Sequence, residues 1–178
     1  HGAMNIFYSI YIAGLGYSKS VVGGLFSLGV VAEIAMFFFM SRVMRRYSLR
    51  RILIVSFSVA VGRFLLIAWC ATLPVLIFAQ ILHSLTFGAF HAASIAAINH
   101  WFRGSARARG QALYSSVAFG AGGLLGGLVS GWSWDHLGGG IAFTLSSLFA
   151  LIGLVLIVKW VSMNEAEEPR ESNIVDAS

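Results

Sequence analysis

The sequence predicts an all-α membrane protein of six transmembrane helices, and two observations support this fold class. Of the 178 residues, 58% are hydrophobic and only 11% are charged, whereas about a quarter of the residues in a soluble domain are charged. The charges are also clustered, which leaves apolar stretches of the roughly 20 residues that a helix needs to cross a bilayer. We therefore expect lipid, rather than water, to surround most of the chain.

Six apolar stretches separated by short polar turns define the expected helices. They lie near residues 1–14, 21–43, 52–71, 74–101, 110–132 and 140–161. Because each turn is short, neighbouring helices should be antiparallel. Residues 1–162 are predicted to form one membrane domain whose first helix is truncated at its start. Residues 163–178 contain five acidic residues and are predicted to form a disordered cytoplasmic tail.

The basic residues predict the orientation of the helices in the membrane, because Lys and Arg are concentrated in cytoplasmic turns. Ten of them fall on one side, against Lys19 alone on the other. The chain is thus expected to be a multi-pass protein of the inner (plasma) membrane, to enter from the cytoplasmic side at His1 and to end in the cytoplasm. The basic residues of the cytoplasmic side are Arg42, Arg45, Arg46, Arg50, Arg51, Arg103, Arg107, Arg109, Lys159 and Arg170.

Composition and motifs exclude several classes of function. The net charge of +5 lies in short turns rather than on one exposed face, so no nucleic acid is expected as a partner. With Cys70 as the single cysteine, a disulfide within the chain and a cysteine-based metal site are excluded. No zinc motif, phosphate loop, dinucleotide fingerprint or catalytic set is found. We expect neither an enzyme nor a bound cofactor.

Two ionisable residues, Glu33 and Arg63, lie inside predicted helices, about ten residues or 15 Å from the cytoplasmic side. A charge at the membrane centre costs roughly 2.5–3.5 kcal/mol on insertion scales, so each residue is a candidate for function. Their helices are joined by a tight turn, which would place the two charges at one level, where they could pair. Such a pair could be structural and stabilise the hairpin. Alternatively, Glu33 takes up and releases the transported proton, and Arg63 keeps the Glu33 carboxylate anionic while no proton is bound.

Polar residues also follow one face of the helix predicted near 74–101. They are Gln80, His83, His91 and Ser94, with Phe87 between them, and at about 100° per residue they fall within roughly 80° of one another. Histidine titrates near physiological pH, with a reference pKa of about 6.5, and can pass a proton or donate to a solute. The alternative is a histidine that only packs. His1, Asn5 and Tyr8 share a face of the first helix and are expected to line the same cavity.

Several segments together resemble a known family of transporters. The basic turn 41–51 resembles the loop between the second and third helices of each half of the major facilitator superfamily, although the usual Asp and Gly are missing. The runs 1–11, 16–18, 27–33, 80–84 and 114–118 look like helices seven to twelve of the phenylpropionate permease group, which is similar to lactose permease. The resemblance spans nearly the whole chain except the tail.

The resemblance implies roles for three of the candidate residues. It assigns solute binding to Glu33 and proton coupling to Arg63 and His83. Thr86 occupies the place of a second Glu in lactose permease, so either Glu33 carries the proton here or the coupling differs from that of lactose permease. The implied partners are a small-molecule substrate, a proton, the bilayer and an amino-terminal six-helix half of the same transporter.

We therefore expect a fragment of a secondary active transporter that carries a small organic solute, such as an aromatic carboxylate or a sugar, by symport with protons. One alternative is a six-helix channel or homodimeric transporter that needs no further half. The other is an intramembrane enzyme that uses His83 or His91, which would require a metal or nucleophile that the pattern does not supply.

Overall fold

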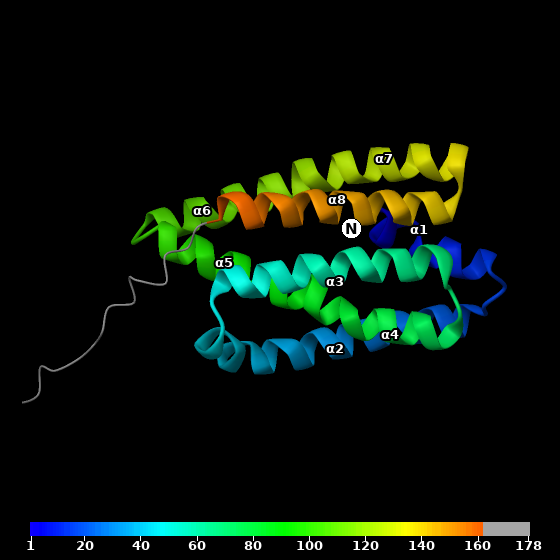
Figure 1. Cartoon of the computed structure of the whole chain (residues 1–178), viewed down its shortest axis with the longest axis horizontal. Coiled ribbons are helices and arrows are strands. Elements are labelled where there is room, and N and C mark those ends of the chain that lie inside the picture. The colour runs from blue at the N-terminus through cyan, green and yellow to red at the C-terminus, as the bar shows by residue number, and fades with distance from the viewer. Residues whose placement is uncertain (162–178) are drawn as a thin grey trace, which may run out of the picture.

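The computed structural model describes residues 1–161 and shows a bundle of helices with no strand in this range (Figure 1). The predicted tail, residues 163–178, lies outside the described residues. In chain order, the helices are α1 (Gly2–Gly14), α2 (Lys19–Arg46), α3 (Leu49–Trp69), α4 (Leu73–His83), η1 (Ser84–Ala89), α5 (Phe90–Trp101), α6 (Ala106–Ser115), η2 (Ser116–Ala121), α7 (Gly122–Leu137) and α8 (Gly139–Trp160).

The elements η1 and η2 are π-helical turns inside two long helices, Leu73–Trp101 and Ala106–Leu137. Counted in this way, the described residues form six helices, close to the six predicted ranges. Five of them are long and apolar enough to cross a membrane. The helix α1 has 13 residues, fewer than the roughly 17 that a membrane crossing needs. Six spans therefore remain a prediction.

Local sequence signals explain where several helices begin and end. The side chains of Ser18 and Ser48 accept hydrogen bonds from the third residue that follows each, at 3.4 Å, and so cap α2 and α3. Pro74 lies in the first turn of α4, where its missing N–H has no helical partner to lose. Gly138 has a φ of +84°, a conformation that glycine adopts without strain and that lets α8 reverse direction after α7.

The order of packing around α3 determines which residues face the interior. Successive helices run in opposite directions, and α3 packs on α8 along one side and on α4, η1 and α5 along the other. The helix α2 packs on α4 and η1, whereas α7 packs on α1 and α8. The helix 73–101 therefore contacts both α2, which carries Glu33, and α3, which carries Arg63.

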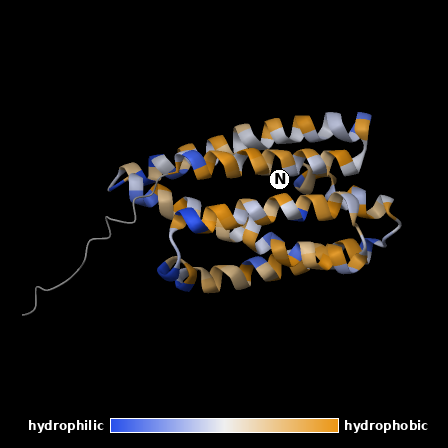
Figure 2. Cartoon of the chain, in the orientation of Figure 1, coloured by the Kyte–Doolittle hydropathy of each residue, from blue (hydrophilic) through white to orange (hydrophobic). Residues whose placement is uncertain are grey.

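Charged and aromatic residues mark the two ends of the bundle. Figure 2 shows hydrophilic residues concentrated at the end where α2 meets α3 and α5 meets α6. Trp101 and Trp160 lie at helix ends on this side, and Trp69 and Trp132 lie near helix ends on the other. All four are at least 59% exposed, as expected for rings at the two interfaces. Which side faces the cytoplasm remains a prediction.

The position of His1 differs from the expectation. His1 was expected at the basic end, but its ring packs against those of Phe64, His83 and Phe87, halfway along the bundle (Figure 1). The physical reason is the length of α1, since 13 helical residues cover only about 20 Å from the opposite end.

Candidate functional site

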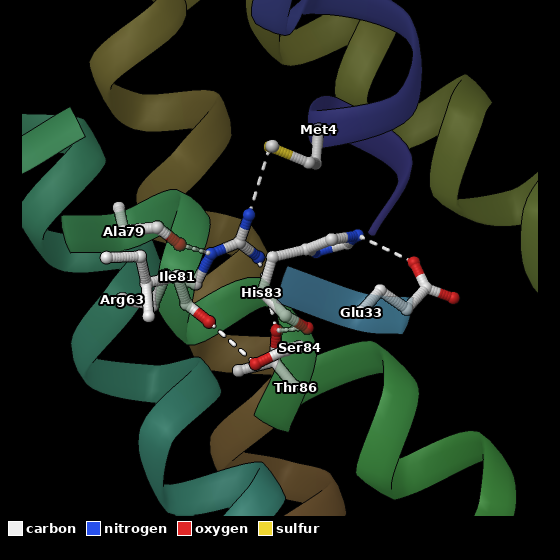
Figure 3. Close-up of polar contacts among 8 residues, drawn as sticks. All are labelled: Met4, Glu33, Arg63, Ala79, Ile81, His83, Ser84 and Thr86. Atoms are coloured by element: carbon white, nitrogen blue, oxygen red, sulfur yellow. Dashed lines mark hydrogen bonds and ion pairs between the residues drawn. The ribbon is translucent and has the colours of Figure 1, made fainter. Parts of the chain in front are cut away.

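Arg63 lies in the interior of the bundle and is completely buried. Its guanidinium group donates hydrogen bonds to the carbonyl oxygen of Ala79 at 2.7 Å and to Thr86 Oγ1 at 3.3 Å, and it contacts Met4 Sδ at 3.5 Å (Figure 3). These acceptors come from α4 and η1, which belong to the helix 73–101, and from α1, so the side chain joins two helices to α3. All three acceptors are neutral groups.

The pairing of Arg63 with Glu33 that the sequence suggested is wrong. No salt bridge connects them within 4.0 Å, and the carboxylate of Glu33 faces His83 instead, with 4.0 Å between His83 Nε2 and Glu33 Oε2. Both residues do lie inside long helices, as predicted, but α2 packs mainly on the helix 73–101 rather than on α3, and Arg63 turns towards that helix and α1. The sequence predicted that both charges lie inside helices, but not which helices pack together or which way each side chain points.

The Glu33–His83 pair is accessible, unlike Arg63. The side chains of His83 and Glu33 are 17% and 20% exposed. A separation of 4.0 Å is too long for a hydrogen bond, so a small movement of either side chain makes or breaks the contact. The pair therefore combines a titratable base and a titratable acid at the edge of the buried region.

The π-helical turn η1 brings three consecutive residues to the site. Thr86 accepts the hydrogen bond from Arg63, Phe87 stacks on His83, and Gly88 packs against α2. A Cβ added to Gly88 would lie 3.3 Å from Glu33 Cγ, so only glycine allows this approach without displacing Glu33. Such turns occur mostly as single interruptions of α-helices and often at functional sites.

A second glycine allows α2 to approach α4. A Cβ on Gly29 would lie 3.0 Å from Gln80 Oε1. Three buried side-chain atoms nearby have no hydrogen-bond partner among the described residues: Tyr8 Oη, Gln80 Nε2 and His83 Nδ1. Buried polar atoms are nearly always hydrogen-bonded, so these three are available to bind a polar solute or to relay a proton.

The predicted stripe along the helix 73–101 forms a ladder of aromatic rings. The ring of Phe87 is nearly parallel to those of His83 and His91, with interplanar angles of 12° and 5° and centroid separations of 5.5 and 6.0 Å. The ring of His1 stands edge-on to His83 and Phe87. The structure thus brings His1, His83, Phe87 and His91 together.

Other predicted residues lie at different distances from this centre. Tyr8 and Gln80 are buried next to it, whereas Asn5 is exposed and makes no side-chain hydrogen bond among the described residues. His91 Nδ1 lies 3.3 Å from Tyr114 Oη, which connects the ladder to α6.

Four residues of the site were not singled out as site residues from the sequence: Met4, Gly29, Gly88 and Phe119. A glycine in an apolar helix looks the same whether it faces lipid or a neighbouring helix, so Gly88 gave no distinguishing signal. Phe119 contacts Phe87, His91 and Tyr114. The repeated letters Phe-Gly-Ala at 87–89 and 119–121 are the signal that could have identified it.

Residues 1–161 contain no group of three His, Cys, Asp or Glu side chains that could hold a metal ion.

Comparison with known proteins identifies the family. The model of the MFS_1 like family matches residues 1–145. The chain belongs to this family of the major facilitator superfamily. The family consists of transporters, so the predictions of a major-facilitator chain and of a protein that is not an enzyme are confirmed.

The chain is also similar to a transporter with a named solute. It is 38% identical over 161 residues to the probable 3-phenylpropionic acid transporter of Escherichia coli strain K12, which confirms the resemblance to the phenylpropionate permease group. The match covers 90% of this chain but 42% of that transporter, so the chain spans less than half the length of its relative. No solved structure matched the chain.

Proposed function

We propose that this chain forms the carboxyl-terminal half of a secondary active transporter that carries a small organic solute together with a proton. The observation that carries the proposal is the contact between Glu33 and His83 at mid-bundle, beside the buried Arg63. Ionisable residues inside membrane helices are costly and mark pathways for ions, protons and substrates. We assign proton exchange to the Glu33–His83 pair.

A partly accessible acid and base 4.0 Å apart can couple a proton to a solute. When Glu33 is protonated, the site carries one less negative charge and favours an anionic or hydroxylated solute. When the proton leaves, the ionised carboxylate disfavours an anion by like-charge repulsion. Loading the proton therefore promotes loading of the solute, which is the requirement for symport.

The polar groups around this pair favour a small solute with oxygen acceptors. Gln80 Nε2 is a buried donor, and Tyr8 Oη and His83 Nδ1 donate or accept depending on their protons. Phe87 supplies an apolar ring next to them. This mixture suits an aromatic carboxylate or a sugar, and the relative's name, probable 3-phenylpropionic acid transporter, supports the former.

We infer that a second, amino-terminal set of six helices encloses the solute together with this chain. Glu33 and His83 are partly exposed, next to the buried side chains of Arg63 and Gln80. The relative is more than twice as long as the matched region.

We also propose the inner membrane as the location and a cytoplasmic carboxyl terminus, on the basis of the distribution of Lys and Arg.

The test is uptake into sealed vesicles that contain the purified transporter of which this chain is part. An inward proton gradient should drive accumulation of 3-phenylpropionate, and a protonophore should abolish it. With Glu33→Gln, accumulation should be lost while exchange of solute across the membrane without a gradient is retained, because the site remains but can no longer release a proton.

Asp135→Asn is the matched control. Asp135 is the other acidic residue of the described part, and it is exposed near the end of α7. Its substitution should leave gradient-driven uptake unchanged. If Glu33→Gln retained accumulation with full dependence on the proton gradient, the coupling role of Glu33 would be excluded.

A further inference from the structure

The two π-helical turns have the same sequence pattern, Ser-x-x-Phe-Gly-Ala. It reads Ser84–Ala89 in η1 and Ser116–Ala121 in η2. Each turn interrupts a helix that continues on both sides, and the Phe occupies the fourth position in both. The rings of Phe87 and Phe119 meet across the two helices, with centroids 6.5 Å apart and an interplanar angle of 61°. Two matched interruptions therefore bring one aromatic pair together.

The turn in the first helix aligns the rings of His83, Phe87 and His91. In a regular α-helix, eight residues carry His91 about 80° around the axis from His83. A π-helical turn is wider, because its hydrogen bonds span one more residue, and it rotates less per residue. The nearly parallel rings, at 12° and 5°, are consistent with this reduced rotation.

Phe119 closes one side of this ladder. Its ring stands at 62° to His91 and at 82° to Tyr114, with centroids 5.8 and 5.9 Å away. It nevertheless remains 49% exposed, and no residue of η2 is buried. An aromatic side chain with three aromatic neighbours on one side and an open face on the other can accept a further ring edge-on or offset.

The open ring of Phe119 belongs to the same polar and aromatic face as the Glu33–His83 pair. Phe87 connects the two, since it stacks on His83 and contacts Phe119. When the acidic group of a solute lies near His83, its apolar end can therefore reach the ring of Phe119, which lies beyond Phe87 on the same face. Sites for small organic ligands combine such apolar walls with a few placed polar groups.

We propose that Phe119 and Phe87 form the subsite that binds the aromatic ring of the solute, and that Phe119 determines the preference for an aromatic over a saturated ring. This inference rests on the proposed transport of a small organic acid and adds the residues that recognise its apolar end. The two π-helical turns position the subsite by turning both Phe side chains towards the same space.

The test measures binding rather than transport, so that it does not depend on proton coupling. The probes are 3-phenylpropionate and 3-cyclohexylpropionate, which share a carbon skeleton but differ in the π system, added to the purified detergent-solubilised transporter that contains this chain. The wild type should bind the aromatic acid more tightly. Phe119→Leu, which keeps an apolar side chain but removes the aromatic ring, should reduce this preference two- to tenfold, whereas Phe119→Trp should keep it.

Phe38→Ala is the control, because Phe38 is 78% exposed on α2 and pairs with no ring among the described residues. It should change the dissociation constant of neither acid. Thermal unfolding of each variant shows whether the fold is intact, and the exposure of Phe119 predicts that it is.

Three results would overturn the subsite: binding of neither acid by the wild type, equal weakening of both acids by Phe119→Leu, or an unchanged preference. Equal weakening would indicate that Phe119 packs against the other half of the transporter. If Phe119→Leu lost the preference but uptake proved independent of a proton gradient, the subsite would stand and the proposed symport would fail.

Discussion

Gly88 allows the π-helical turn to pack directly against Glu33: a Cβ at this position would lie 3.3 Å from Glu33 Cγ. Gly88→Ala should therefore displace the carboxylate by a few tenths of an ångström from its place beside His83. Because this contact is already 4.0 Å long, we expect gradient-driven uptake to fall several-fold while the protein still inserts and folds. The measurement is the initial rate of 3-phenylpropionate uptake into vesicles of known protein content.

Gly120 provides the matched control for this substitution. It occupies the same place in η2 as Gly88 does in η1, and a Cβ added there meets nothing within 4 Å. Gly120→Ala should change the uptake rate less than twofold. Similar losses for both variants would mean that the backbone of the π-helical turns, rather than the contact with Glu33, is responsible.

Thr86 should stabilise the fold by accepting a hydrogen bond from a buried cation. Thr86→Val keeps the shape of the side chain but removes the acceptor of Arg63 Nη1. A hydrogen bond to a charged group contributes about 1.5–3 kcal/mol, so the midpoint of thermal unfolding in detergent should fall by several degrees. Thr86→Ser should restore most of the loss.

Thr144 offers a comparison with a neutral, exposed bond. Its Oγ1 accepts a hydrogen bond from Trp69 Nε1 at 3.1 Å, and Thr144→Val should cost about 1 kcal/mol or less. If Thr86→Val were no more harmful than Thr144→Val, Arg63 would not depend on this acceptor.

The helices could be predicted from the sequence because apolar periodicity and breakers act locally. Ser18, Ser48 and Pro74 mark helix starts within a few residues of their predicted places. The π-helical turns were not predicted, since an α-helix and a helix with one wider turn have the same apolar pattern. The only sign of them is the repeated Phe-Gly-Ala.

The partners of buried charges could not be predicted from sequence, because they depend on which way each helix turns about its axis. The position of Arg63 inside a helix was predicted, but its hydrogen bond to the carbonyl oxygen of Ala79 uses a backbone group that every residue possesses. Glu33 faces His83 because Gly29 and Gly88 allow α2 to approach the helix 73–101 closely. That approach is a property of the folded bundle.

The packing of α3 against α8 should depend on the absence of a side chain at Gly153. A Cβ there would clash with the ring of Phe57, and Phe57 is itself packed against Phe90. Gly153→Ala should therefore destabilise the protein by about 1–3 kcal/mol, as expected for overpacking. Chemical denaturation in micelles provides the measurement.

Gly24→Ala is the opposite case within a helix of the same bundle. A Cβ on Gly24 meets nothing within 4 Å, and alanine favours a helix by up to about 1 kcal/mol over glycine. This variant should be as stable as the wild type or more so. Loss of stability from Gly24→Ala, or none from Gly153→Ala, would contradict the packing described for these helices.

The contact between Glu33 and His83 predicts that their substitutions do not act independently. Glu33→Gln and His83→Gln should each lower the initial rate of gradient-driven uptake while downhill entry of the solute remains measurable, because each removes one titratable partner of a pair only 4.0 Å apart. The double variant should be little worse than the more affected single variant, since residues in contact show coupling energies of about 0.5–3 kcal/mol. Initial rates for the wild type, the two single variants and the double variant at one proton gradient give the coupling energy between Glu33 and His83.

The control pairs Glu33→Gln with Thr144→Val, which removes the exposed hydrogen bond to Trp69, and these two substitutions should have additive effects. Strict additivity for Glu33 and His83 as well would mean that they serve separate steps.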